Sequence, residues 1–389
     1  MAASPEWSPP RGDAILIAAQ SGRALAQAAR RAGLRPYVLD LFGDGDTLAL
    51  AEGHRPARGR FGDGLSGEGV LSGLDALAVM AKTPPIGIVL GSGFENATDL
   101  MERIARRHRL LGAGPETVRA LKDPLAFAAL CARLAIPHPD VTREAVAERS
   151  GWLLKRAGGS GGSHIRPAGA GRAPSGAYFQ RRVGGRARAV AFLADGREAT
   201  VLAVTEQWSA PSPLRPFRYA GALERAAREA PILPASTLSQ VTAAIAGIVA
   251  ETGLRGLASA DLLVSDEGWW LTEINPRPGA TLDILDRRET PLLTAHIDAS
   301  LGVLPLVEAA PVDAAASEIC YAAAGYAPMP PLDWPDFVRD RPQSGACVPR
   351  DAPLCTVFAA GPDSAATRDL LRVRAATLRT LLATTEEAR

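Results

Sequence analysis

Three side chains in the segment 259–275 could bind a divalent metal ion. The segment predicts a β-hairpin whose strands place Asp261 opposite Glu273, with Asn275 on the same face. Two like charges opposite each other destabilise a hairpin unless a cation neutralises them. Two carboxylates and an amide oxygen are hard ligands of the kind that Mg²⁺ accepts. The pattern predicts a magnesium site, and a solvated acidic strand at a sheet edge is the alternative.

This alignment of the two carboxylates depends on the length of the hairpin loop. A three-residue loop with Gly268 in the left-handed conformation pairs Ser265 with Trp269 and brings Asp261 opposite Glu273. A four-residue loop would shift the register and offset the carboxylates. We expect the three-residue loop.

A glycine-rich segment after a basic strand could bind phosphate. Residues 152–156 predict a strand that contains Lys155, and Gly-Gly-Ser-Gly-Gly-Ser follows at 158–163. Backbone N–H groups of such a loop can approach phosphate oxygens, and a nearby ammonium adds positive charge. The segment lacks the Gly-Lys-Ser/Thr of a P-loop, and a flexible linker is the alternative. Arginine dominates the basic residues, which suggests a specific need for the few lysines: Lys82, Lys122 and Lys155.

The elements at the N-terminus predict an open parallel sheet. Two short apolar strands, at 14–19 and 37–40, flank a helix with short connections, which is a βαβ unit. A further strand at 86–90 ends in a polar and glycine-rich segment. Ligands bind at the carboxyl ends of strands in such sheets. No GxGxxG follows the first strand, so we expect no dinucleotide site there.

Two helices further along the chain have clear end signals. Asp123 is expected to cap a helix that begins at Pro124. A longer helix is expected to start near Ser236 or Thr237 and to end at Gly253.

The composition limits the class of protein. The 389 residues are 47% apolar and 22% charged, which predicts a globular chain of two or three domains. A net charge of +1 predicts no nucleic-acid or membrane partner. No apolar run approaches the roughly 20 residues of a membrane span, and no signal peptide is recognisable, so we expect a cytoplasmic protein. The cysteines lack metal-site spacing and are expected to be buried: Cys131, Cys320, Cys347 and Cys355.

The order of these parts resembles the ATP-grasp superfamily over about residues 12–310. Leu-Thr-Glu-Ile-Asn-Pro-Arg-Pro-Gly at 271–279 is similar to that family's metal-binding signature. Trp-Leu-Leu-Lys-Arg at 152–156, with the glycines after it, resembles its lysine and lid segment. Tyr-Phe-Gln-Arg-Arg-Val-Gly-Gly at 178–185 looks like the hinge between lobes, whose backbone holds adenine.

The resemblance implies a role for each of these residues. Lys155 would contact the phosphates of ATP, and Arg277 would steady an acyl-phosphate or the substrate carboxylate. The metal residues would hold Mg²⁺ or Mn²⁺: Asp261, Glu273 and Asn275. The lid would close over the phosphates with Gly158, Gly159, Ser160, Gly161 and Gly162. The hinge residues bordering adenine would be Gln180, Arg181, Arg182 and Val183. The acceptor substrate would face Ser92, Gly93, Phe94 and Glu95.

Two departures from the family pattern bear on nucleotide binding. Many relatives have Asp-Lys at the helix start, whereas this chain has Lys122 before Asp123, a displacement of two positions. We therefore do not expect Lys122 to contact ATP, and Lys122→Ala should weaken ATP binding only mildly. Gln180 stands where the hinge acid is expected, and 186–188 (Arg-Ala-Arg) stands where an acid often binds ribose.

The implied fold is α/β with three parts. A Rossmann-like domain at 1–114 would precede an ATP-grasp domain at 115–310, and 311–389 would form a small C-terminal domain. The two α+β lobes of the ATP-grasp domain would span 115–183 and 184–310.

The implied activity is that of a carboxylate–amine ligase that proceeds through an acyl-phosphate and releases ADP and phosphate. The partners would be a small-molecule carboxylate and an amine, with glutamate or another amino acid as the first to test, and a homodimer is compatible with this. The segments 40–44 and 92–95 look like a branch of predicted carboligases that is associated with pterin or furan cofactors of one-carbon metabolism. The alternatives are an ATP-grasp carboxylase, although no Met-Lys-Met segment is present, and a non-catalytic nucleotide-binding scaffold.

Overall fold

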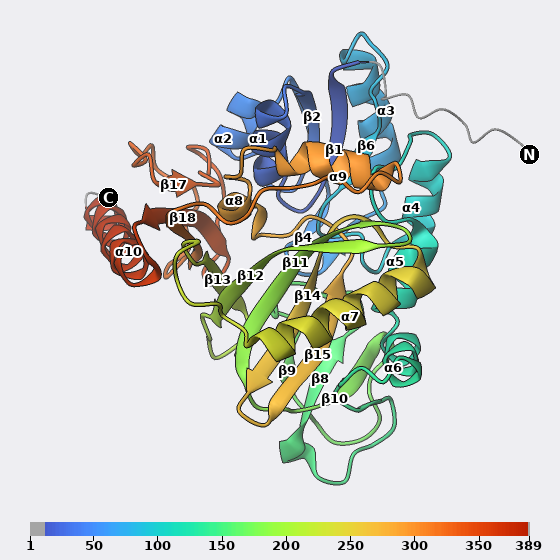
Figure 1. Cartoon of the computed structure of the whole chain (residues 1–389). Helices are drawn as coiled ribbons and strands as arrows, with labels where there is room; N and C mark the ends of the chain where they lie inside the picture. Colours follow the sequence, from blue (N-terminus) through green and yellow to red (C-terminus); the bar gives the residue numbers. More distant parts are fainter. Residues whose placement is uncertain (1–11, 388–389) are drawn as a thin grey trace, which may run out of the picture.

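The computed structural model describes residues 12–387 and shows an α/β protein with a parallel sheet at one end (Figure 1). This sheet has the order β3-β2-β1-β6, and all its pairings are parallel, which confirms the expected βαβ arrangement. The elements of this region are β1 (Ala14–Ala18), α1 (Arg23–Arg31), β2 (Arg35–Asp40), α2 (Gly45–Leu50), β3 (Gly53–Pro56), β4 (Gly59–Arg60), β5 (Gly64–Leu65), α3 (Val70–Met80), β6 (Ile88–Leu90) and α4 (Thr98–Ala105).

Alternating residues of β1 face opposite layers of helices. Leu16 packs in the same apolar cluster as Leu74 of α3, whereas Ile15 and Ile17 pack with Leu25 of α1. A strand that is buried on both faces must be apolar throughout, and every residue of β1 is buried. The carboxyl ends of β1 and β6 lie side by side, where the Gln20 N–H donates to the Ser92 carbonyl.

A small antiparallel sheet of order β7-β10-β8-β9 follows in the chain. It carries the predicted lysine strand and hinge strand as neighbours, because β8 pairs with β10. The elements of this region are α5 (Pro115–Lys122), α6 (Pro124–Arg133), β7 (Val141–Thr142), a 3₁₀ turn at Arg149–Gly151, β8 (Trp152–Arg156), β9 (Arg166–Pro167) and β10 (Ala177–Arg181). Asp123 caps α6 as expected, since its carboxylate accepts the N–H groups of Leu125 and Ala126 at 3.0 and 2.8 Å.

The largest sheet is antiparallel and has eight strands in the order β15-β14-β11-β12-β13-β16-β18-β17. Strands β16 to β18 come from the C-terminal part of the chain and continue the sheet through pairing of β13 with β16. The boundary at 310 therefore lies between strands of one sheet, and it stays a prediction. The elements are β11 (Arg186–Asp195), β12 (Ala199–Ser209), β13 (Tyr219–Glu224), α7 (Ala235–Thr252), β14 (Arg255–Ser265), β15 (Gly268–Asn275), α8 (Leu282–Leu285), α9 (Leu292–Ser300), β16 (Ala314–Tyr321), β17 (Val338–Arg339), β18 (Pro353–Gly361) and α10 (Ser364–Glu387).

Helices cover both faces of this sheet (Figure 1). Phe192 of β11 packs in the cluster that contains Ile245 of α7, whereas Leu193 packs in the cluster that contains Leu292 of α9. Helix α9 also contacts α1, which packs on the parallel sheet. The long helix ends at Gly253 as expected, but its N-cap is Pro234 rather than Ser236 or Thr237, since a proline at this position already ends the preceding extended segment.

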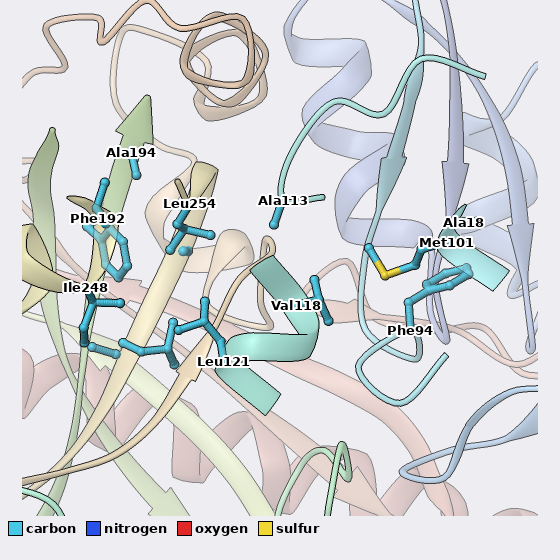
Figure 2. Packing of buried hydrophobic residues seen from close by; sticks show 14 of the residues in the cluster. Ala18, Phe94, Met101, Ala113, Val118, Leu121, Phe192, Ala194, Ile248 and Leu254 are labelled. Carbon is cyan, nitrogen blue, oxygen red and sulfur yellow. The ribbon is translucent and has the colours of Figure 1, made fainter. Parts of the chain in front are cut away.

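One apolar cluster joins the N-terminal region to the sheets that follow it (Figure 2). Figure 2 shows Phe94 and Met101 on one side, Val118 and Leu121 of α5 in the middle, and residues of β11 and α7 on the other. Phe94 is only 3% exposed and packs in this core, and its contact with an acceptor substrate stays a prediction. A large aromatic ring next to Met101 and Leu100 gains more from burial than from exposure in a polar site. This continuous core fixes the position of α5.

Two simpler expectations are also decided by the structure. Cys131 and Cys355 are buried and Cys320 is half-buried, but Cys347 is exposed, because it lies in a surface loop after β17. In the described part of the chain, no helix combines the length and apolar character that a bilayer crossing requires.

A buried histidine joins α9 to two other elements. The His296 Nδ1 accepts the Leu257 N–H at 2.8 Å, and its Nε2 lies 2.9 Å from the Leu111 carbonyl oxygen. The ring is therefore neutral with the proton on Nε2. Burial lowers its pKa to about 4, although the bond to Leu111 acts in the opposite direction.

We expect the neutral His296 to make folding pH-dependent. The pKa of this histidine is about 6.5 in the unfolded chain and about 4 in the folded protein. Its contribution to stability is therefore complete above pH 6.5 and is lost as the pH falls toward about 4, at roughly 1.4 kcal/mol per pH unit. Urea unfolding at pH 7.5, 6 and 5 measures the slope. His296→Gln should be less stable at every pH and should have a shallower slope, and equal slopes in the two proteins would contradict this role.

Candidate active site

The β14–β15 hairpin brings Asp261 opposite Glu273, but not by the expected register. The loop is shorter than predicted, since Ser265 pairs with Gly268 rather than with Trp269. A β-bulge at Thr272 then inserts one residue, and its hydroxyl donates to the Asp261 carbonyl at 3.0 Å. The shorter loop shifts the register of the two strands by one residue, and the bulge shifts it back, so Asp261 still lies opposite Glu273.

The metal residues predicted from the sequence lie together at the base of this hairpin. The Asn275 amide Nδ2 donates to Asp261 Oδ2 at 2.9 Å, so both side chains are held on one face. Among residues 12–387, no cluster of three or more His, Cys, Asp or Glu side chains could hold a metal ion, and the hairpin offers two carboxylates and one amide oxygen.

Lys122 lies between these oxygens. Its ammonium Nζ donates to Glu273 Oε1 at 2.5 Å and to Asn275 Oδ1 at 3.0 Å. The displaced sequence position does not keep Lys122 away from the metal residues, because Lys122 is the last residue of α5 and that helix ends beside the hairpin. That Lys122 makes no contact with ATP stays a prediction. The rarity of lysine in the chain was the only sequence signal that could have identified it.

The two carboxylates of the hairpin differ in electrostatic environment. Burial, and then the charge of Glu273, raise the pKa of Asp261 to about 6. Burial would also raise the pKa of Glu273, but Lys122 and Lys155 outweigh it and lower that pKa to about 2. The like-charge repulsion expected from the sequence is thus relieved by lysine in this state of the protein.

Lys155 on β8 completes this charge cluster. Its buried ammonium donates to Gln180 Oε1 at 2.7 Å on the neighbouring strand β10. Burial lowers the pKa of Lys155, and the carboxylates of Glu273 and Asp261 act against that shift. The ammonium groups of Lys122 on α5 and Lys155 on β8 thus both interact with the carboxylates of the hairpin.

The glycine-rich segment lies over this cluster in a closed position. The Tyr219 N–H donates to the Gly161 carbonyl at 2.8 Å, and the Gln20 amide donates to the Ser160 hydroxyl at 3.2 Å. Gly162 has a φ of +66°, and a Cβ there would lie 2.0 Å from the Phe217 carbonyl oxygen. This close approach requires glycine, because any side chain would push the segment away from Phe217, which lies just before β13.

A narrow pocket of about 20 Å³ lies between α5, α6, β8 and β10. Its lining includes Lys122, Glu273 and Gln180, together with His164, whose ring packs directly on Gly159. Burial lowers the pKa of His164 to about 4, and its Nδ1 is buried without a hydrogen-bond partner in the described residues. The closed glycine-rich segment leaves room for about one water molecule, so a nucleotide can enter only after this segment moves.

The predicted hinge residues are divided between this pocket and the surface. Gln180 is buried in the pocket lining, whereas the side chains of Arg181 and Arg182 are exposed and Val183 is half-buried. The N–H groups of Arg181 and Arg182 donate to the carbonyls of Asp140 and Gly151. Of the four hinge side chains, the structure brings only Gln180 to the charge cluster.

Arg277 lies just beyond the hairpin and is held by a predicted substrate residue. Its guanidinium Nε donates to Glu95 Oε1 at 2.8 Å, and Glu95 Oε2 accepts the Gly93 N–H at 2.6 Å. Burial would raise the pKa of Glu95, but Arg277 and Lys122 lower it. Glu95 is 5% exposed and thus positions Arg277 instead of facing a substrate freely.

Arg277 and Ser92 line a second, larger cavity of about 200 Å³. Its walls come from the ends of β1 and β6, the glycine-rich segment, β13, the residues after β15, and the C-terminal strands β16 and β18. Ser160 and Gly161 line this cavity, whereas Gly158 and Gly159 line the narrow pocket. One loop therefore separates the charge cluster from a cavity of the size of a small organic molecule.

Comparison with known proteins assigns this geometry to a family. A family model described as an ATP-grasp domain matches residues 125–281. Residues 125–281 of this chain form an ATP-grasp domain. The matched segment begins in α6 and ends just after Arg277, so it contains the predicted lysine strand, lid, hinge and metal residues.

The relatives of this chain are distant in sequence. It is 26% identical over 239 residues to the carbamoyl phosphate synthase large chain of Deinococcus radiodurans, covering 55% of this chain but 23% of that protein. Biotin carboxylase from Campylobacter jejuni has a TM-score of 0.68 at 15% identity, covering 93% of this chain and 90% of the other. L-amino acid ligase from Bacillus licheniformis has a TM-score of 0.68 at 14% identity, covering 94% and 97%. The fold of nearly the whole chain is thus shared with these two enzymes.

The position of Lys122 predicts a stability defect when its charge is removed. Lys122→Met should lower the free energy of unfolding by roughly 2 kcal/mol, since it leaves Glu273 without its partner while Glu273 stays 30% exposed. Urea unfolding at pH 7 measures this change, and Lys82→Met at an exposed position is the matched control. A loss no larger than that of the control would contradict the central position of Lys122.

Proposed function

We propose that this protein is an ATP-dependent ligase that joins a small-molecule carboxylate to an amine and releases ADP and phosphate. One observation carries the proposal. The ammonium groups of Lys122 and Lys155 converge with the oxygens of the hairpin, and a separate cavity large enough for a small organic molecule lies beside them. Phosphoryl transfer needs positive charge and exact positioning around the phosphates, and the acceptor must reach them from the other side.

The chain has groups suited to ATP and a divalent metal ion. The Lys122 ammonium touches both Glu273 and Asn275, so these oxygens already converge on one cation, and Asp261 is hydrogen-bonded to the same amide. These three residues would hold Mg²⁺ or Mn²⁺, which would offset the negative charge of the phosphates. Lys122 would then turn from these oxygens toward phosphate, and Lys155 would contact phosphate as well.

The chemistry divides between the two cavities. A substrate carboxylate oxygen attacks the γ-phosphorus of ATP, the bond to the β–γ bridging oxygen breaks, and ADP leaves. The amine then attacks the acyl carbon, phosphate departs with the bonding electrons, and the nitrogen loses a proton. Arg277 follows the hairpin that carries the metal residues and lines the large cavity, where it would neutralise the charge of the acyl-phosphate. The closed glycine-rich segment excludes water, which would otherwise hydrolyse that intermediate.

A role in making pterin or furan cofactors is a narrower form of this proposal. It rests on the segments 40–44 and 92–95, and three of their residues line the large cavity: Phe42, Asp44 and Ser92. Their positions support contact between these segments and a substrate in the cavity.

The reaction class can be tested by its products. We expect ADP and phosphate, and never AMP and pyrophosphate, from a panel of carboxylates and amino acids with Mg-ATP. Hydroxylamine should trap a hydroxamate when a carboxylate is supplied without an amine, since it intercepts an acyl-phosphate. Formation of AMP would exclude this mechanism. Formation of ADP without a hydroxamate from any carboxylate would favour the nucleotide-binding scaffold.

The residue assignments predict a graded loss of turnover. Glu273→Gln should reduce kcat by at least about 100-fold at saturating Mg²⁺, Asp261→Asn should act similarly, and Asn275→Ala should act less strongly. Lys155→Ala should weaken ATP binding most, because its ammonium is buried beside Gln180. Initial rates and ATP titration measure these effects, with Lys82→Met as the unaffected control. Near-normal activity of Glu273→Gln would refute the metal assignment.

A further inference from the structure

A carboxylate without a partner faces the large cavity. Asp44 is 6% exposed and lies in the cavity lining. It is the N-cap residue of α2, yet its side chain accepts no hydrogen bond from the helix. Throughout residues 12–387, no hydrogen bond or ion pair to its carboxylate is found. An aspartate at this position normally accepts a backbone N–H of the first turn, so a free carboxylate that borders a cavity is available to a ligand.

The groups around Asp44 are already committed to one another. The Arg23 guanidinium binds both carboxylate oxygens of Asp283, and its Nε donates to Asp340 at 3.0 Å. Asp46 accepts the N–H groups of Asp340 and Arg341 at 2.8 and 3.0 Å. Asp44 is thus the carboxylate of this group that retains its full capacity to accept hydrogen bonds.

The charge near Asp44 favours a cation. Besides burial, the carboxylates of Asp40, Asp46 and Asp340 raise the cost of ionising Asp44, and Arg23 acts in the opposite direction. Burial is the largest cause, and together these effects raise the pKa of Asp44 to about 8. An anion would be repelled here, and an arriving ammonium would supply the missing positive charge.

The rest of the cavity wall suits an organic body and not a bare metal ion. Aromatic and aliphatic side chains line it beside the single free carboxylate: Leu25, Phe42, Phe61, Ile319 and Tyr321. The Tyr219 hydroxyl also borders the cavity, and it is buried without a hydrogen-bond partner in the part of the chain that the structure describes. One free carboxylate and one hydroxyl match the needs of an amine better than the several oxygen ligands of a divalent ion.

The same cavity is also lined by Arg277. Asp44, Tyr219 and Arg277 therefore border one continuous space.

We propose that Asp44 binds the ammonium group of a small organic amine whose body packs against Phe42, Phe61 and Tyr219. The inference rests on the proposed function, since this amine would be the nitrogen substrate of the ligase or a second amino group that it carries. It assigns one wall of the cavity to the amine and leaves the Arg277 wall to the carboxylate.

Direct binding without ATP tests the inference. Calorimetry or ligand-observed NMR with the full chain would compare benzylamine and n-hexylamine with the neutral isosteres benzyl alcohol and n-hexanol. Both amines should bind at least tenfold more tightly than the alcohols. Asp44→Asn should lower amine affinity at least tenfold without changing alcohol affinity, whereas Asp75→Asn, at an exposed carboxylate of α3, should bind amines as the natural chain does.

The outcomes separate this inference from the proposed function. Equal binding of amines and alcohols, absence of saturable amine binding, or wild-type amine affinity in Asp44→Asn would overturn the assignment of Asp44. Thermal unfolding of Asp44→Asn establishes that the variant is folded. Glu273→Gln should lose turnover but keep amine binding, because Glu273 does not line this cavity. If AMP is the product while the amines still bind through Asp44, the ligase proposal fails and the amine site stands.

Discussion

The charge balance between two lysines and two acidic residues is the interaction on which the site depends. Lys122 and Lys155 meet Asp261 and Glu273 in a space that is largely closed to water. Either pair of like charges alone would be strongly destabilised there, because burial penalises every unpaired charge. The four groups come from α5, β8 and the β14–β15 hairpin, so the balance requires all three elements to be in place.

The apolar core explains how this balance is positioned. Leu121 and Val118 of α5 are buried in the cluster that connects the parallel sheet to β11 and α7 (Figure 2). Because the helix is fixed by these contacts, its last residue, Lys122, has a defined place at the hairpin. The ion pair between Arg277 and Glu95 makes a second link, from the residues after β15 to the end of β6. Packing and charge therefore fix the same relative position of the N-terminal region and the large sheet.

The glycine-rich segment connects the two cavities physically. Its first residues border the narrow pocket, and Ser160 and Gly161 border the large cavity. It contacts Gln20 of the N-terminal region and Tyr219 of β13 at the same time. A molecule in either cavity would touch this segment, which gives a structural route by which nucleotide and acceptor could each influence closure.

Much of the fold could be predicted from residues that are close in the sequence. The buried β1 strand, the cap at Asp123 and the hairpin at 259–275 depend on local apolar periodicity and on turn or cap residues, and the structure contains all three. The hairpin also shows the limit of local rules. Its predicted loop was wrong, and the alignment of Asp261 with Glu273 arises from a bulge at Thr272 that no turn rule anticipates.

The α/β class, the hairpin with its acidic residues, and Lys155 beside a glycine-rich loop could all be inferred from residue patterns. Four features became visible only in the folded chain: Lys122 contacts the hairpin, Phe94 is a core residue, Glu95 holds Arg277, and Asp44 faces a cavity without a partner. The physical reason is distance along the chain: Lys122 and Glu273 are 151 residues apart. Local patterns set which elements form, whereas the meeting of such distant side chains depends on how the finished elements pack.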